Sequence, residues 1–499
     1  MTPRSIAFYV AFILISSAGF AAAPPTPIIK EQQTFDLLMF GSPVGRMVAQ
    51  DLAVTEENEQ RTGTRMIVEM TLNRMGASAS VGMNHFEIYH PDGRLAHFRT
   101  ELNTAMMPQI TVGKVVGDVC QIQTNGRQMQ IPFDRDAVSE RQLEEDFKKL
   151  VQDGVGAKFS SKVFVPDLMK TVPTTTTLTR IENRQTHFGE KQLFCVETAM
   201  NVGTVVKSHS WVDSDGDVYE QETALGPITL QAVRVSGDAP KPVISDMAPD
   251  VFEKMILRPD KQLGNPLRIH DAQFKLRFTQ APSGPIRQAT FYSDDSQKVL
   301  PAGRDAVVLH ITSAAPAGGV PLSSVTAPPV DGEKYLKPTS LVQSDDPQIV
   351  SIAQEIRKKN TDAWALSKAL EKWVNNHLTE KSLNVAFASA KETLETREGD
   401  CTEHATLLVA LLRAAGLPAR AAEGLVYAQS IGGFGYHMWT EVYLNGRWYD
   451  LDATRPGALT DATHIQMGAS AMDESTAVDL STQILKYLGQ FQIEVEKAG

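Results

Sequence analysis

An apolar helix that must begin at a cysteine constrains this chain more than any other feature of its sequence. Gly399 and Asp400 break the chain immediately before Cys401. The apolar residues that follow at helical spacing are Leu407, Leu408, Leu411 and Ala414, and the segment Gly416-Leu417-Pro418 ends the pattern. We therefore expect Cys401 in the first turn of a helix.

A thiol in the first turn of a helix is in a position to react. The unpaired backbone N–H groups and the helix dipole together act as about half a positive charge, which stabilises a thiolate and can supply donors to an oxyanion. Farther along the chain His437 and Asp452 follow in the order of a base and of the carboxylate that orients it.

The chain around His437 and Asp452 predicts two paired strands. The residues after His437 alternate in side-chain character, and Asn445-Gly446 is a favoured two-residue hairpin turn. With the turn centred between these two residues, positions whose numbers sum to 891 face each other, so His437 lies opposite position 454. Asp452 is then within diagonal reach of His437 on the same face.

Four segments in this order match one family pattern: Gly399-Asp400-Cys401, Leu411 to Arg420, His437-Met438-Trp439-x-Glu441-Val442 and Asp452-Ala453-Thr454. From about Asp346 to Thr454 the chain resembles the transglutaminase-like superfamily, papain-related proteins in which a helix presents a cysteine to a sheet carrying the histidine and the acid. The resemblance implies that Cys401 is the nucleophile, His437 the base and Asp452 the orienting acid of a catalytic triad.

The resemblance implies a thiol enzyme without defining its substrate. Tissue-type, calcium-dependent transglutaminases have a cysteine between glutamine and tryptophan, whereas Cys401 lies between Asp400 and Thr402. Similar bacterial proteins include cysteine peptidases and amidases, which are hydrolases, as well as proteins of undefined activity, and an acyltransferase would share the same first half-reaction. We expect a Cys401 thioester formed from a protein, a peptide or a cell-envelope amide and resolved by water or an amine. The alternative is a non-catalytic envelope binding or assembly protein whose N-terminal β domain holds a ligand or partner.

Residues 1–23 predict export. Arg4 precedes an apolar stretch from Ile6 to Ile15, and Ala21-Ala22-Ala23 stands before Pro24, which is the layout of a cleaved signal peptide. The apolar stretch is short for a membrane span of roughly 20 residues. We expect a periplasmic or secreted protein without a transmembrane segment.

The three cysteines fit an oxidising compartment. Cys120 and Cys195 could form a disulfide there and leave Cys401 as the reactive thiol, but geometry decides whether they do so.

No metal or cofactor is expected. The run Asp213 to Asp217 has the opening spacing of a calcium loop, but Val218 stands where the loop needs glycine, so a hairpin turn is favoured. His404 follows Cys401 by one helical turn without any paired metal-binding spacing. We expect Trp439 to point to the face opposite His437, within the core.

The formal net charge of −11 argues against nucleic acid as a partner, because no segment gathers Lys and Arg into a stripe.

The order of elements predicts an α+β chain. Short alternating runs from about Gln32 to Gly237 indicate antiparallel sheet, interrupted by one helix with Ser139 as its N-cap. Strands are also expected at Thr463 to Met467 and at Phe491 to Val495, both extending the catalytic sheet, with a helix from Ala477 to Leu488 between them.

The predicted domains are a signal peptide at 1–23, an N-terminal mostly antiparallel β-rich domain at 24–240, a second β region with a Pro/Gly-rich linker at 241–338, and a papain-like transglutaminase core at 339–499.

Overall fold

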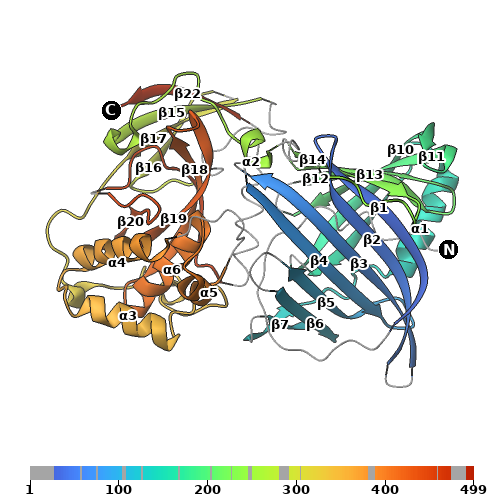
Figure 1. The fold of residues 1–499 in the computed structure, drawn as a ribbon, viewed down its shortest axis with the longest axis horizontal. Coiled ribbons are helices and arrows are strands. Elements are labelled where there is room, and N and C mark those ends of the chain that lie inside the picture. The colour runs from blue at the N-terminus through green and yellow to red at the C-terminus, as the bar shows by residue number, and fades with distance from the viewer. Residues whose placement is uncertain are drawn as a thin grey trace. The chain divides into compact units, whose positions relative to one another are not determined.

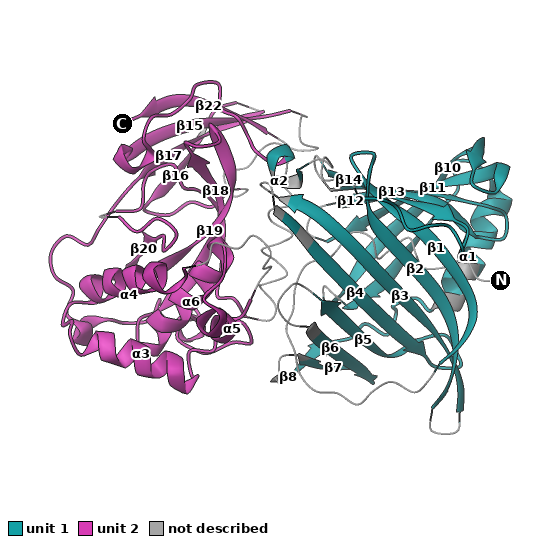
Figure 2. Cartoon of the chain, viewed as in Figure 1, with its two compact units in different colours: residues 1–254 teal, residues 255–499 magenta. Residues whose placement is uncertain are grey.

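The computed structural model contains two compact units, residues 1–254 and 255–499 (Figure 2). The structure describes residues 27–56, 59–74, 77–103, 108–124, 127–166, 169–202, 205–225, 228–244, 250–279, 291–303, 305–379, 388–457, 459–473 and 491–499. The predicted signal peptide and the helix predicted at 477–488 lie outside these ranges. No helix within them has the length and apolar character needed to cross a membrane.

Unit 1 is built on one antiparallel sheet, which has 14 strands among the described residues (Figure 1). Its strand order is β8-β7-β6-β5-β4-β3-β2-β1-β14-β13-β12-β11-β10-β9, so the first and last strands of the unit pair at the middle of the sheet. The strands are β1 (Ile28–Met39), β2 (Ser42–Glu56), β3 (Glu59–Arg74), β4 (Ala77–Tyr89), β5 (Leu95–Asn103), β6 (Pro108–Val116), β7 (Val119–Thr124), β8 (Arg127–Pro132), β9 (Lys158–Val165), β10 (Lys170–Thr186), β11 (Gly189–Asn201), β12 (Val205–Val212), β13 (Val218–Leu225) and β14 (Ile228–Val235).

Two helices belong to this unit, α1 (Glu140–Asp153) and the short α2 (Val251–Lys254), among the residues described. Ser139 caps α1 as predicted, since its side chain accepts a hydrogen bond from the backbone N of Gln142 at 3.1 Å. Phe147 and Leu150 of α1 join the buried side chains of the sheet in one hydrophobic cluster. The predicted mostly antiparallel N-terminal β fold is thus confirmed.

Cys120 and Cys195 do not form a disulfide in this structure. Cys120 on β7 is buried in a cluster with Phe98, and Cys195 on β11 is buried in a separate cluster with Trp211. Burial raises the pKa of the Cys120 thiol to about 11, so this thiol is protonated and unreactive at neutral pH.

Unit 2 contains two antiparallel sheets, each with four strands within the described ranges (Figure 1). One has the order β16-β17-β15-β22 and the other, the catalytic sheet of the predictions, has the order β20-β19-β18-β21. The elements are β15 (Asp271–Phe278), β16 (Gln297–Pro301), β17 (Ala306–Thr312), α3 (Pro347–Arg357), α4 (Ala363–His377), α5 (Ala390–Thr396), α6 (Cys401–Ala414), β18 (Ala419–Ala428), β19 (Gly433–Leu444), β20 (Arg447–Leu451), β21 (Ile465–Ser470) and β22 (Phe491–Ala498), with short 3-10 turns at Pro266–Arg268, Leu322–Ser324 and Gly332–Tyr335.

The two sheets share a hydrophobic cluster that includes Phe274 of β15, Phe434 of β19 and Ile465 of β21. β21 pairs with β18 and so extends the catalytic sheet as predicted. The strand predicted at Phe491 to Val495 forms β22, but it pairs with β15 in the other sheet, so its predicted place was wrong. Alternating apolar residues suit any sheet edge, and a strand pattern therefore does not identify its partner.

The hairpin that carries the candidate acid has the predicted register. Thr440 pairs with Leu451 and Leu444 with Arg447, across a turn in which Asn445 and Gly446 have φ of 49° and 86°. Both values lie in the left-handed region that a tight hairpin turn requires and that asparagine and glycine tolerate.

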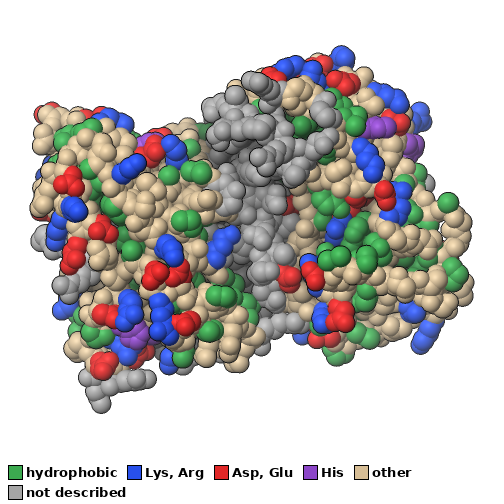
Figure 3. Space-filling model, turned by 180° about the vertical axis from the view of Figure 1, so that it is seen from behind, with side chains coloured by type: hydrophobic (Ala, Val, Ile, Leu, Met, Phe, Trp, Pro, Cys, Tyr) green, Lys and Arg blue, Asp and Glu red, His purple; other side chains and the backbone are tan. Residues whose placement is uncertain are grey.

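Charged side chains of both signs are interspersed over the described residues on the face shown in Figure 3. Ion pairs between exposed or partly exposed side chains include Lys359 with Glu355 and Arg277 with Glu494. Exposed pairs of this kind contribute little to stability, so the fold depends on its hydrophobic clusters.

The close approach of β18 and β21 yields a stability prediction. A Cβ added at Gly424 would lie 1.9 Å from the carbonyl oxygen of Ile465, so Gly424→Ala must push the two backbones apart. We expect a loss of roughly 2 kcal/mol or more in the free energy of unfolding, measured by urea titration. Gly264→Ala is the matched control, because nothing lies within 4 Å of its added Cβ. Equal stability of the two variants would contradict the prediction.

Candidate active site

Cys401 is the first residue of α6, as predicted, and a network of backbone hydrogen bonds holds it there. The Asp400 side chain accepts from the backbone N of Thr402 at 2.9 Å, and Glu403 Oε2 accepts from the backbone N of Asp400 at 2.9 Å. The other oxygen of Glu403 accepts from the backbone N of Ala388 at 2.9 Å. Glu403 is fully buried and therefore ties the helix start to the preceding segment.

Gly399 makes this entry to the helix possible. Its φ is 156°, and an added Cβ would lie 2.3 Å from Cβ of Glu403. Only glycine fits between the chain and the buried Glu403 side chain, so the sequence Gly-Asp-Cys fixes the place of the thiol.

Two hydrogen bonds define the direction of α6 relative to β19. Thr440 Oγ1 donates to the carbonyl oxygen of Ala405 at 3.3 Å, and beyond the helix the backbone N of Tyr443 donates to the carbonyl oxygen of Pro418 at 2.9 Å. The helix and the strand therefore run in the same direction. Cys401, four residues before Ala405, lies toward the end of β19 that carries His437.

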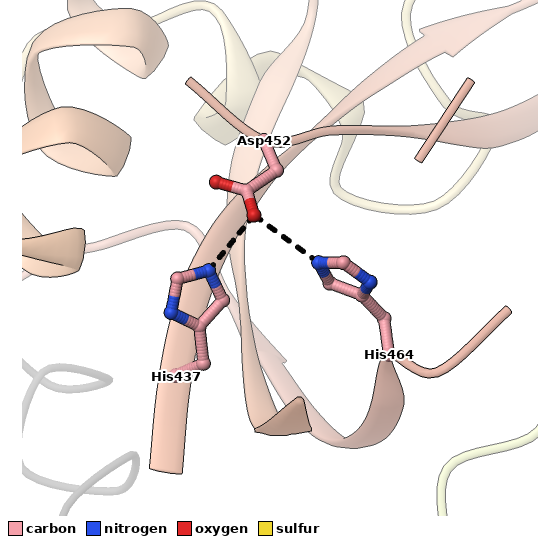
Figure 4. A group of neighbouring side chains, drawn as sticks. All are labelled: His437, Asp452 and His464. Carbon is pink, nitrogen blue, oxygen red and sulfur yellow. Dashed lines mark hydrogen bonds and ion pairs between the residues drawn. The ribbon is translucent and has the colours of Figure 1, made fainter. Parts of the chain in front are cut away.

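His437 and Asp452 meet at the far end of the hairpin, as the register predicted. Nε2 of His437 lies 3.0 Å from Oδ2 of Asp452 (Figure 4). The other ring nitrogen, Nδ1, points away from the carboxylate (Figure 4). An imidazole whose Nε2–H is held by a carboxylate has a basic Nδ1, and this is the nitrogen left to take a proton from a thiol.

Helix α4 and a local turn hold Asp452 in place. Its Oδ1 accepts from the backbone N of Thr454 at 2.9 Å and from the Thr454 hydroxyl at 2.6 Å. The backbone N of Asp452 donates to Glu371 Oε1 of α4 at 3.0 Å, and Asn375 of the same helix donates to the carbonyl oxygen of Ala453 at 2.7 Å. Asp452 therefore has little freedom to turn away from His437.

Asp452 is 2% exposed and nevertheless ionised. Burial by itself raises the pKa of a carboxyl group. Here the charge and hydrogen bond of His437, together with those of His464, outweigh burial and hold the pKa of Asp452 well below its usual range.

His464 is the member of this group that the sequence did not predict. Its Nε2 lies 3.2 Å from the same Oδ2 of Asp452, and its Nδ1 lies 3.0 Å from the carbonyl oxygen of Asp461 (Figure 4). Burial lowers the pKa of His464, but the Asp461 charge and the hydrogen bonds to Asp452 and Asp461 outweigh it and raise the pKa to about 9. A signal was present in the sequence, because Asp461-Ala462-Thr463 repeats the Asp452-Ala453-Thr454 turn.

Trp439 lies on the same side of β19 as His437, contrary to the prediction. The two rings are stacked at 17° with centroids 6.3 Å apart, and the edge of His464 meets the indole with centroids 5.1 Å apart. Residues two apart on a strand share a face, so the prediction misapplied the alternation. The indole N–H donates to Asp450 at 2.7 Å, and the buried ring lies against both imidazoles.

His437, Asp452 and His464 also form a group whose possible ligand atoms lie within 4.8 Å of one another. His464 and Arg455, whose Nε lies 3.5 Å from Asp452 Oδ2, already bring positive charge to Asp452 and Asp461. A divalent ion would add more positive charge in this buried place. His404, which the sequence raised as a ligand, instead directs Nδ1 to the carbonyl oxygen of Asp400 at 2.6 Å.

Residues 350–453 match the transglutaminase-like superfamily, which confirms the resemblance found in the sequence. No curated protein matches the chain.

Three solved structures resemble parts of the chain. A candidate cysteine protease from Cytophaga hutchinsonii is 19% identical, with a TM-score of 0.31, over 42% of this chain and 85% of its own. The periplasmic domain of TgpA from Pseudomonas aeruginosa bound to ethylmercury is 16% identical, with a TM-score of 0.25, over 39% and 93%. A beta-barrel-like protein of a domain of unknown function from Brucella abortus is 13% identical, with a TM-score of 0.35, over 43% and 98%. None of the three assigns a role to a residue of this chain.

The raised pKa of His464 predicts how stability depends on pH. The folded value of about 9 lies above the ordinary value of 6.5, so the stabilisation is fully present below pH 6.5 and is lost as the pH rises through 9. We expect a loss of roughly 3 kcal/mol in the free energy of unfolding across that range. Urea titration, with unfolding monitored by tryptophan fluorescence, measures this free energy at each pH. Unit 2 contains Trp364, Trp373, Trp439 and Trp448.

His464→Gln is the control, because it removes the titrating ring. A stability that falls equally over this range in both proteins would contradict the assignment of the loss to His464.

Proposed function

We propose that this protein is an exported thiol enzyme that cleaves or transfers an acyl group of an amide or peptide through a thioester at Cys401. The observation that carries the proposal is the 3.0 Å contact of His437 with the buried, ionised Asp452, on a strand that runs alongside the helix beginning at Cys401. The match of residues 350–453 to the transglutaminase-like superfamily supports it.

In the first half-reaction, Nδ1 of His437 takes the proton of the Cys401 thiol, and the thiolate attacks the acyl carbon. A C–S bond forms while the carbonyl π electrons move onto oxygen. We assign the backbone N–H of Cys401, at the N-terminus of α6, as an oxyanion donor. The C–N bond then breaks as His437 returns its proton to the leaving amine.

In the second half-reaction, neutral His437 takes a proton from water or from an amine that attacks the thioester. The C–S bond breaks, the acid or new amide leaves, and the thiolate regains a proton. Asp452 remains a carboxylate throughout and stabilises the imidazolium whenever it forms. Substrates that fit this chemistry are proteins, peptides and cell-envelope amides.

Export follows from the signal-like arrangement of residues 1–23 and is part of the same proposal. N-terminal sequencing of protein from a periplasmic or secreted fraction tests it, with a start near Pro24 as the expected result and an intact Met1 as the contradicting one.

The second candidate is a binding or assembly protein that uses unit 1. A cavity of about 460 Å³ lies on its sheet, lined by residues that include Met70, Val81, Gly82 and Pro242. A ligand released on denaturing the purified full-length chain, together with an unreactive Cys401, would favour this candidate over the enzyme.

The central experiment measures the rate of Cys401 alkylation by iodoacetamide as a function of pH, with the adduct located by mass spectrometry. We expect rapid reaction well below the ordinary thiol pKa of about 8.5, because His437 stabilises the thiolate, and a loss of at least about 10-fold at pH 6 in His437→Ala. Cys401→Ala should retain the wild-type melting temperature. Alkylation with ordinary thiol pH dependence in both proteins would contradict the proposal.

A further inference from the structure

We propose that His464 is a positioning residue for the Cys401 site: as an imidazolium it contacts the same oxygen of Asp452 that His437 contacts, and it keeps that carboxylate ionised and aligned. The inference rests on the proposed function and names a group that acts on that site through Asp452.

The first observation is a pair of matching turns. Asp452-Ala453-Thr454 precedes Arg455, and Asp461-Ala462-Thr463 precedes His464, so each turn is followed by a basic residue. In both turns the threonine N–H donates to Oδ1 of the aspartate, at 2.9 Å and 3.0 Å, and the threonine hydroxyl donates to the same oxygen. Oδ2 of each aspartate is left to face the basic side chains.

The second observation is that a basic side chain of each turn contacts the aspartate of the other turn. His464 Nε2 lies 3.2 Å from Oδ2 of Asp452, and Arg455 lies 3.5 Å from the same atom and 3.6 Å from Oδ2 of Asp461. His464 therefore bonds the aspartate of the other turn, which is the one that supports His437.

Hydrogen-bond partners make His464 a cation. Its Nδ1 faces the carbonyl oxygen of Asp461 at 3.0 Å, and a carbonyl oxygen only accepts, so Nδ1 carries a proton. Its Nε2 faces the ionised carboxylate of Asp452, which also only accepts, so Nε2 carries a proton as well. Arg455 lies 3.5 Å from this nitrogen, farther than the carboxylate does.

The remaining groups that face His464 are consistent with this charge. The ring of His437 lies edge to face with it at a centroid distance of 5.8 Å, and both rings contact Oδ2 of Asp452. The indole of Trp439 packs against the His464 ring. The N–H of this indole donates to the carboxyl group of Asp450, and burial raises the pKa of that carboxyl group. The two negative charges that balance His464 and Arg455 thus come from Asp452 and Asp461.

The consequence concerns the protonation state of Asp452. Without the charge of His464, the buried carboxylate of Asp452 would have only His437 and the more distant Arg455 beside it, and it would take up a proton more readily. With His464 charged, Asp452 stays an acceptor for Nε2–H of His437, which keeps Nδ1 of His437 available to the thiol of Cys401.

The test uses the full-length protein and the pH dependence of Cys401 alkylation by iodoacetamide, which needs no substrate. In His464→Gln the amide can still donate a hydrogen bond to Asp452 but carries no charge. We expect the midpoint of the acid limb to move up by about one pH unit, while the rate on the alkaline plateau changes by less than about twofold. A merely structural role would lower the rate by the same factor at every pH and leave the midpoint in place.

His310→Gln is the matched control, because His310 on β17 also faces an aspartate, Asp271, at 3.3 Å, but does not contact the site. Its profile should coincide with the wild type. If His464→Gln does not fold, Asp461→Asn replaces it, since this change removes the charge facing Nδ1 with little change in size, and the same upward shift is expected.

Two results would overturn the inference, and they distinguish a failure of the His464 role from a failure of the proposed function. An activated wild-type thiol whose acid limb is unmoved in the folded His464 or Asp461 variant rejects the role of His464 alone. A wild-type Cys401 that titrates near the ordinary value of about 8.5 rejects the proposed function as well.

Discussion

One oxygen atom, Oδ2 of Asp452, lies within hydrogen-bond distance of two imidazole rings in the interior of unit 2. Burying a carboxylate is unfavourable unless charges and donors surround it, and most of the local structure serves that end. The Thr454 turn donates to the other oxygen, α4 holds the backbone through Glu371, and His464 brings a positive charge. His437 can be oriented because Asp452 is held.

The thiol side of the site depends on a different physical effect. Local capping presents Cys401 at the start of α6, because Gly399 permits a backbone turn that other residues would not fit and Asp400 then caps the helix. The same N-terminal N–H groups favour a thiolate and an oxyanion. Helix and strand are joined by the contact of Thr440 with Ala405, so the two halves of the site belong to one hydrophobic core.

The parts of this structure that the sequence predicted are those governed by local rules. The start of α6 at Cys401 follows from Gly399-Asp400 and the apolar period, and the register that unites His437 with Asp452 follows from the Asn445-Gly446 turn. Long-range partners were not predictable in this way. β22 joined another sheet, because alternation does not specify an edge, and His464 was missed, because its role depends on a crossed contact between two turns. Trp439 was misplaced although the two-residue period of a strand sufficed to place it.

The central claim is that Asp452 enables His437 to activate Cys401 for acyl transfer, and an acylation assay tests it most directly. p-Nitrophenyl acetate added to the full-length protein should release nitrophenolate in a burst and leave one acetyl group on Cys401, as read by mass spectrometry. In Asp452→Asn the amide can donate to Nε2 of His437 and fix the wrong tautomer, so we expect the acetylation rate to fall by at least about 10-fold while the fold is retained. Acetylation of Cys401 at the same rate in the folded variant would contradict the account.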